Sequence, residues 1–207
     1  MVCTRGTPKN SGSRDPRDCN NYFYAWCVPY VHVITPEVAL RGASALIANS
    51  VTRIPDKSIN PLIKNYHWGD FTKGLFEAKD KNYETVILTD QDKNITEGPG
   101  FNVFTVTNSI LTTSNHGVLN GITRQTVIEI ARKLKIRIQI RNLPKSELIK
   151  ADEVFISTSG GGIILITQVN NRVYANGICA PLTLKIHEVY WDWIKNSNYR
   201  TEINYLD

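Results

Sequence analysis

The chain has 207 residues and a net charge of +5; 42% of its residues are hydrophobic and 21% are charged. This length predicts one domain or one and a half, with enough apolar material for a sizeable core, and the composition is that of an ordinary globular protein. The lysines and arginines are scattered, without a basic block or an aromatic–basic stripe, so we expect no nucleic-acid-binding surface.

The N-terminal part of the chain looks different from the rest. The first six residues read like the end of a strand, and residues 7–20 are rich in Pro, Gly, Ser, Asn and charge, which predicts a loop. Residues 22–34 are strongly apolar and aromatic, and they predict one or two buried strands broken near Pro29. We therefore expect a short N-terminal remnant at residues 1–20 and one large domain at residues 21–207.

From residue 43 onward the pattern alternates between strand and helix. The clearest helix is expected at residues 123–135, and others are expected at 69–79, at 144–150, which Pro144 opens, and at 182–195. Strands are expected at residues 85–89, 101–107, 110–112, 136–140, 154–157, 163–169 and 172–174. This mixture of many short strands and few helices predicts an α/β or α+β fold.

The cysteines and histidines do not suggest a metal site. No CxxC pair is formed by the four cysteines, Cys3, Cys19, Cys27 and Cys179, and the four histidines are unpaired as well, which argues against zinc. A reducing compartment is the default for such a chain. No apolar run approaches membrane-spanning length, and the N-terminus lacks a signal-peptide core. We therefore expect a cytoplasmic protein without metal or membrane partners.

Two ionisable residues, Lys64 and Glu97, are candidates for a catalytic or cofactor-binding role because of the residues around them. A lysine bonds a carbonyl carbon only when it is deprotonated, so its pKa must be lowered by burial or by a neighbouring cation. We expect Tyr66, His67 and Trp68 to exclude water from Lys64. Glu97 lies among glycines just before a strand, and a carboxylate can keep a pyridine nitrogen protonated. Taken alone, each would be an ordinary surface or turn residue.

Two turns are suited to a phosphate group. The Gly-Ile-Thr turn at residues 121–123 precedes the clearest helix, where free N–H groups and the helix dipole attract an anion. The Ser-Thr-Ser-Gly turn at residues 157–160 follows a buried strand and offers hydroxyls on a glycine-permitted backbone. The alternatives are an ordinary helix cap by Asn120 or Thr123 and a loop of small residues. One lysine, one carboxylate and two such turns, in this order, are the parts that pyridoxal phosphate requires.

These residues resemble the class IV, or fold-type IV, pyridoxal-phosphate enzymes. That group includes branched-chain aminotransferases, D-amino-acid aminotransferases and aminodeoxychorismate lyases, and the chain is most similar to its (R)-selective amine transaminases. The resemblance implies an α/β (α+β) large C-terminal domain over residues 21–207, with mixed sheets that form a pseudo-barrel between flanking helices. The matching segments are residues 64–78, 88–90, 96–102, 117–124, 157–161 and 181–205.

The resemblance also implies roles for individual residues. Lys64 would be the catalytic lysine that forms a Schiff base with pyridoxal 5'-phosphate and moves protons. The cofactor-binding residues would be Lys64, Glu97, Ile122, Thr123, Ser157 and Thr158. The substrate-binding residues would be Trp68, Arg14 and Val33.

The chain departs from the family at its start. Members carry a smaller N-terminal domain, and this chain begins where that domain should be ending. The domain holds an arginine for the cofactor phosphate and residues that complete the pocket across a homodimer interface. Three alternatives follow: a transaminase acting on an amine, or a D- or branched-chain amino acid, with a 2-oxo acid; an aminodeoxychorismate-lyase-like enzyme; or a non-catalytic remnant. The context of Trp68 and the long C-terminal tail favour the transaminase.

Overall fold

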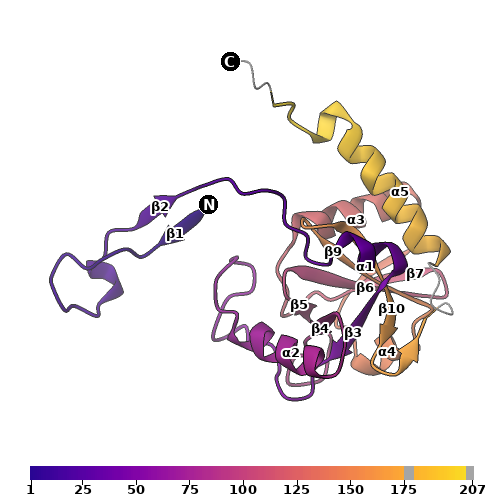
Figure 1. The fold of residues 1–207 in the computed structure, drawn as a ribbon, viewed down its shortest axis with the longest axis horizontal. Coiled ribbons are helices and arrows are strands. Elements are labelled where there is room, and N and C mark those ends of the chain that lie inside the picture. The colour runs from indigo at the N-terminus through magenta and orange to yellow at the C-terminus, as the bar shows by residue number, and fades with distance from the viewer. Residues whose placement is uncertain (175–179, 204–207) are drawn as a thin grey trace. The chain divides into compact units, whose positions relative to one another are not determined.

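The computed structural model describes residues 1–174 and 180–203. It forms two compact units, Met1–Val31 and His32–Asp207, and in the larger one a central sheet is flanked by helices (Figure 1). Cys179 and the last residues of the matching tail, including Tyr205, lie outside the described residues. None of the helices in the described part of the chain is long and apolar enough to span a membrane.

The small unit is a two-stranded hairpin. Strand β1 (Val2–Thr4) pairs antiparallel with β2 (Tyr22–Tyr24), which confirms the strand expected at the N-terminus. Every residue of β2 is exposed, and of the apolar run only Ile34 is buried. The prediction of buried strands at residues 22–34 is therefore wrong. The physical reason is that a lone hairpin has no second layer against which its aromatic side chains could pack.

The larger unit is built on a nine-stranded mixed sheet. Its strands run in the order β4-β3-β10-β9-β6-β7-β8, with β11 beside β10 and β5 beside β6. The pairs β3–β4, β3–β10 and β7–β8 are parallel and the others are antiparallel. The strands are β3 (Ala43–Ile47), β4 (Thr85–Ile87), β5 (Glu97–Gly98), β6 (Phe101–Thr107), β7 (Ile110–Thr113), β8 (Ile138–Ile140), β9 (Glu153–Thr158), β10 (Gly162–Val169) and β11 (Arg172–Val173).

Part of this sheet closes into a ring. Leu88, directly after β4, donates its N–H to the carbonyl of Glu97 and accepts the N–H of Thr96, each at 3.0 Å. Strand β5 then pairs with β6 in a register that puts Glu97 opposite Asn102. Strands β4, β3, β10, β9, β6 and β5 therefore form the pseudo-barrel that the resemblance implied. An apolar cluster fills it and includes Ala45, Ile87, Phe101, Val103, Ile156, Ile164 and Ile166.

Helices cover the outer face of the ring. Phe71 of α2 packs with Val86 of β4 and with Leu88 directly after it, while α3 and α5 cover Phe104 and Phe155, whose rings stack at 4.9 Å. The helices are α1 (Pro36–Arg41), α2 (Gly69–Asp80), α3 (Ile122–Lys133), α4 (Lys145–Lys150) and α5 (Pro181–Lys195). Because α2 and α3 both begin close to β5, the residues on that part of the outer face lie between two helix N-termini.

The four expected helices and the expected strands from residue 85 onward are confirmed, with ends that differ by a few residues. Pro144 caps α4 rather than occupying its first turn. Helix α1, which Pro36 opens, was not expected from the sequence. Six residues are too few for a helical period to show, and the neighbouring aromatic run had suggested strands instead.

Candidate functional site

Glu97 is the best-anchored side chain of the site. It is 5% exposed, and its Oε1 lies 3.2 Å from Nη2 of Arg53. Its Oε2 accepts the N–H of Leu119 at 2.8 Å and an amide N–H of Asn102 at 3.3 Å. Burial raises the pKa of Glu97, while the Leu119 N–H and the charges of Arg53 and Lys64 oppose that rise without cancelling it. The carboxyl is thus held in one orientation by donors from three segments.

Arg53 bridges Glu97 and the start of α2 by ion pairs. Its Nη1 lies 2.6 Å from Oδ2 of Asp70 in the first turn of that helix, and its guanidinium stacks 4.3 Å from the ring centre of Phe71. Asp70 also accepts the N–H of Ile54 at 3.0 Å. The roles of Arg53 and Asp70 could not be predicted from the sequence. Asp70 belongs to a matching segment, but the ion pairs span 17 and 44 residues and carry no local signal.

The N-terminus of α3 lies on the other side of Glu97. Its cap residue, Gly121, has no side chain, and no side chain of the described residues caps the helix there. The alternative of an ordinary side-chain cap is therefore wrong. A Cβ at Gly121 would lie 2.5 Å from Oδ1 of Asn102, so this turn packs directly on the residue that donates to Glu97. Thr123 is buried there and Ile122 is exposed.

The second predicted turn joins the same face of the sheet. Ser157 lies opposite Asn102, and Asn102 lies opposite Glu97, so the three residues form one row across β9, β6 and β5. The Ser157 Oγ is buried and has no hydrogen-bond partner among the described residues. Thr158 donates its hydroxyl to the carbonyl of Gly100 at 2.8 Å. An orphaned buried hydroxyl beside a helix N-terminus fits a group that carries oxygen acceptors.

Two of the predicted substrate residues lie beside this turn. Val33 donates its N–H to the carbonyl of Gly160 at 2.8 Å. A Cβ built on Gly100, whose φ is +86°, would lie 3.6 Å from Val33 and 4.0 Å from Trp68. These two apolar side chains therefore approach the same glycine from different segments. Arg14 belongs to the N-terminal unit, so its role stays a prediction.

Lys64 is exposed, contrary to expectation. It lies in the loop between β3 and α2, and Tyr66 and Trp68 beside it are 78% and 41% exposed. The prediction that these neighbours exclude water from Lys64 is wrong. The reason is local: Asn65 closes a tight turn by bonding to Ile63 and to the His67 N–H, and the side chains of this turn point to solvent. The charge of Lys64 still reaches Glu97, where it counters the burial-induced rise in pKa.

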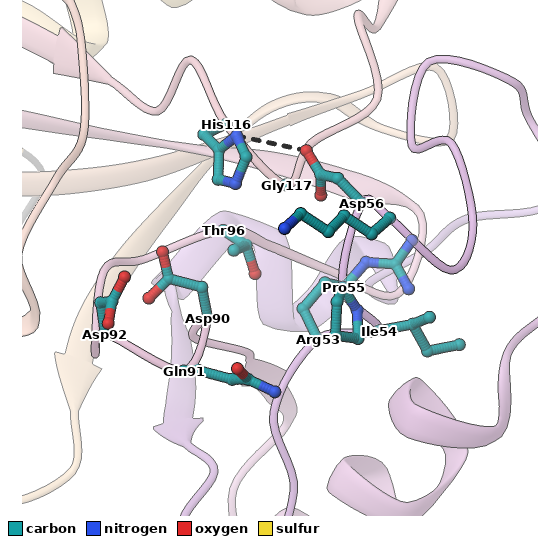
Figure 2. A pocket seen from close by; sticks show the side chains of 11 residues that line it. Arg53, Ile54, Pro55, Asp56, Asp90, Gln91, Asp92, Thr96, His116 and Gly117 are labelled. Atoms are coloured by element: carbon teal, nitrogen blue, oxygen red, sulfur yellow. Dashed lines mark ion pairs between the residues drawn. The ribbon is translucent and has the colours of Figure 1, made fainter.

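A cavity of about 330 Å³ lies next to the site without forming part of it (Figure 2). Its lining includes Arg53, Thr96 and an ion pair of 3.2 Å between His116 and Asp56. Neither Lys64 nor any residue of the two turns borders this cavity. Glu97 and Ser157 lie in one row of the sheet with Asn102, and neither borders this cavity, which among the described residues shares only Arg53 with the site.

Comparison with known proteins identifies the family. The sequence profile of the class IV amino-transferases matches residues 8–169. A Methanocaldococcus jannaschii chain assigned as a branched-chain-amino-acid aminotransferase is 29% identical over 197 residues, which cover 93% of this chain and 65% of that one. The branched-chain aminotransferase of Thermoproteus uzoniensis, solved with norvaline, superposes with a TM-score of 0.75 and 27% identity, over 92% of this chain and 63% of that one.

A second solved structure carries a cofactor form. The T.th. branched-chain amino acid aminotransferase, solved with pyridoxamine 5'-phosphate, superposes with a TM-score of 0.74 and 25% identity, over 80% of this chain and 56% of that one. The chain thus spans less than two thirds of the length of each of these relatives. The profile match runs through both predicted phosphate turns, Lys64 and Glu97. The chain belongs to the class IV aminotransferase family.

Proposed function

We propose that this chain carries the cofactor site of a pyridoxal-phosphate-dependent aminotransferase, which transfers an amino group from an amine or amino acid to a 2-oxo acid. One observation carries the proposal: the buried Glu97 carboxyl is oriented by Arg53, Leu119 and Asn102 beside the open N-terminus of α3. A buried carboxyl beside an anion-binding helix end matches a ligand with a basic ring nitrogen at one end and a phosphate at the other.

Each predicted residue has a task in this proposal. Pyridoxal phosphate, when bound, supplies a pyridine ring that accepts electrons from the substrate carbon. Glu97 would accept the N–H of a protonated ring nitrogen, and Lys64 would supply the amine that bonds the cofactor and moves the substrate proton. The residues that would hold the phosphate, through N–H groups and hydroxyls, are Ile122, Thr123, Ser157 and Thr158.

The substrate side of the proposal rests on Val33 and Trp68. Both are apolar and approach Gly100, and Val33 also bonds to Gly160, which suits a donor with a branched or aromatic side chain. The relatives named as branched-chain aminotransferases favour an amino-acid donor, whereas the resemblance to amine transaminases favours an (R)-amine. We propose the (R)-configured donor, and the comparison of amine, D-amino-acid and L-amino-acid donors below tests it.

The test is a titration of the purified chain with pyridoxal phosphate, followed by borohydride reduction and peptide mapping. A visible band should appear, and the reduced cofactor should be attached at Lys64. Lys64→Ala should lose both, whereas Lys73→Ala, which removes an exposed lysine of α2, should keep both. Adding (R)-amines, D-amino acids or branched-chain L-amino acids then shows which donor converts the bound cofactor to its amine form. A band and adduct that persist in Lys64→Ala would contradict the assignment.

A further inference from the structure

The segment Ser114–Asn120 joins β7 to α3 and contacts both Glu97 and the turn that begins α3. The N–H of Leu119 donates to Oε2 of Glu97 at 2.8 Å. The carbonyl of Leu119 accepts from Asn102 at 3.0 Å and from the N–H of Gly121 at 2.8 Å. The position of this segment therefore sets both the orientation of Glu97 and the start of α3.

Arg124 joins the two ends of this segment. It lies in the first turn of α3, it is 5% exposed, and its side chain reaches back over the segment. Its Nη2 donates to the carbonyl of Ser114 at 2.8 Å, and its Nη1 donates to Oδ1 of Asn120 at 3.1 Å. A planar guanidinium can bridge two acceptors in this way, while a lysine ammonium reaches them only as a point charge.

This arrangement is costly as a purely structural device. Both acceptors of Arg124 are neutral, and its buried Nε has no partner among the described residues. A cation in the first turn of a helix also opposes the helix dipole. Burial lowers the pKa of Arg124, and attraction to Glu97 opposes that shift. The buried charge fixes residues 114–120 in place and interacts electrostatically with the carboxyl of Glu97.

We propose that Arg124 is a positioning residue that clamps residues 114–120, so that the Leu119 N–H stays on Glu97 and the first turn of α3 stays in place for a phosphate. Arg124 acts through the segment and not on the substrate. The expected effect on cofactor binding rests on the proposed function. The clamp itself does not, because it consists of hydrogen bonds within the chain.

The test compares Arg124→Gln and Arg124→Lys with the parent chain in two measurements. Amide hydrogen exchange at Leu119 reports the clamp without any cofactor and should speed up about tenfold, as expected when a buried charged hydrogen bond is lost. Titration with pyridoxal phosphate should show affinity reduced about tenfold or more in both variants, because lysine cannot bridge the two acceptors. The pH at which the visible band changes should also shift, which a merely structural role would not cause.

Two further variants serve as controls. Asn120→Ala removes one acceptor of the clamp and should act in the same direction, with an effect that is not additive to Arg124→Gln. Arg132→Gln removes an exposed charge from the same helix and should behave like the parent. If Arg124→Gln does not fold, Arg124→Lys and Asn120→Ala provide the same comparison.

The outcomes separate this inference from the proposed function. If the parent binds no pyridoxal phosphate, the proposed function fails, and the exchange rate of Leu119 still decides the clamp. If the parent binds the cofactor and folded Arg124 variants keep both its affinity and its exchange rate, the clamp is overturned. An equal loss in Arg132→Gln would also overturn it, because the effect would then be one of general charge.

Discussion

The side chains of this site are held in place by hydrogen bonds from residues that are distant in the sequence. Glu97 shows this best, because its two oxygens bind Arg53, Leu119 and Asn102, which come from three different parts of the chain. Such a carboxyl cannot turn away to water, and a ring nitrogen would find it already oriented. Preorganisation of this kind acts on rate more than on affinity, since it stabilises charge that develops during the reaction.

Replacing Glu97 by Gln tests this at the residue scale. The amide keeps the size of the side chain but no longer pairs with a protonated ring nitrogen, so single-turnover conversion of the cofactor should slow by about a hundredfold or more. Affinity for pyridoxal phosphate should change far less. Stopped-flow absorbance gives the rate and a titration gives the affinity. Glu129→Gln, at an exposed position of α3, is the control, and a rate equal to the parent's in Glu97→Gln would remove Glu97 from this role.

At the scale of elements, carboxylates join helix α2 to the strands beneath it. Glu77 of α2 accepts the N–H groups of Asn49 and Ser50, just after β3, and pairs with Lys81 at 2.7 Å. At the start of the helix, Asp70 pairs with Arg53, which in turn pairs with Glu97 of β5. The helix is therefore attached at both ends, and the loop that carries Lys64 runs between these two anchored points.

The pKa of Glu77 makes this attachment sensitive to acid. Burial alone would raise that pKa, but hydrogen bonds from Lys81, Ser50 and Asn49 outweigh it and lower the pKa to about 2. Because the folded-state pKa lies below the unfolded value, the stabilisation is present above about pH 4.5 and is lost as the pH falls towards 2. Glu77→Gln should cost about 2 kcal/mol of unfolding free energy at pH 6.

Denaturant unfolding at several pH values checks this expectation. The difference between parent and Glu77→Gln should shrink steadily below pH 4.5 and should be close to zero near pH 2. Asp80→Asn, at an exposed position of the same helix, should change the stability little at any pH. A difference that stays constant from pH 6 to pH 2 would show that Glu77 stabilises by packing and not by its charge.

At the scale of the whole molecule, much apolar and reactive surface faces solvent. The exposed side chains include Tyr22, Phe23, Trp26, Leu62, Ile63, Tyr66 and Phe76. Lys64 lies in the same exposed loop as Tyr66. Exposed apolar side chains of this kind, in each of the two units, mark interaction sites, and water at Lys64 weakens the electrostatic interactions on which the proposed reaction depends.

We therefore expect residues 1–207 on their own to associate, with a homodimer as the first species, and to turn over little substrate. Sizing chromatography over a range of concentrations measures the association. Single-turnover conversion with an (R)-amine, beside a longer relative such as the Thermoproteus uzoniensis enzyme, measures the activity. A monodisperse monomer with fast turnover would mean that the exposed apolar surface does not cause association and that the exposure of Lys64 does not reduce activity.

The sequence by itself determined helix α2, the elements from residue 85 onward apart from β5, the family and the candidate residues of the site. These depend on local patterns: the helical period of residues 123–135, the glycine before that helix, and the hydroxyl residues at the end of β9. Glu97 could be predicted in the same way, because its glycine-rich segment carries a motif of the family.

Only the tertiary structure decided how these parts are held together and what faces water. The ring closes through Leu88 and Glu97, and the pairs of Arg53 with Asp70 and Glu97 span 17 and 44 residues, so no local pattern encodes them. The same limit explains the errors at β2 and Lys64. An apolar or aromatic segment indicates that a side chain could be buried, but burial requires a second segment to cover it, and which segments meet is a property of the whole fold.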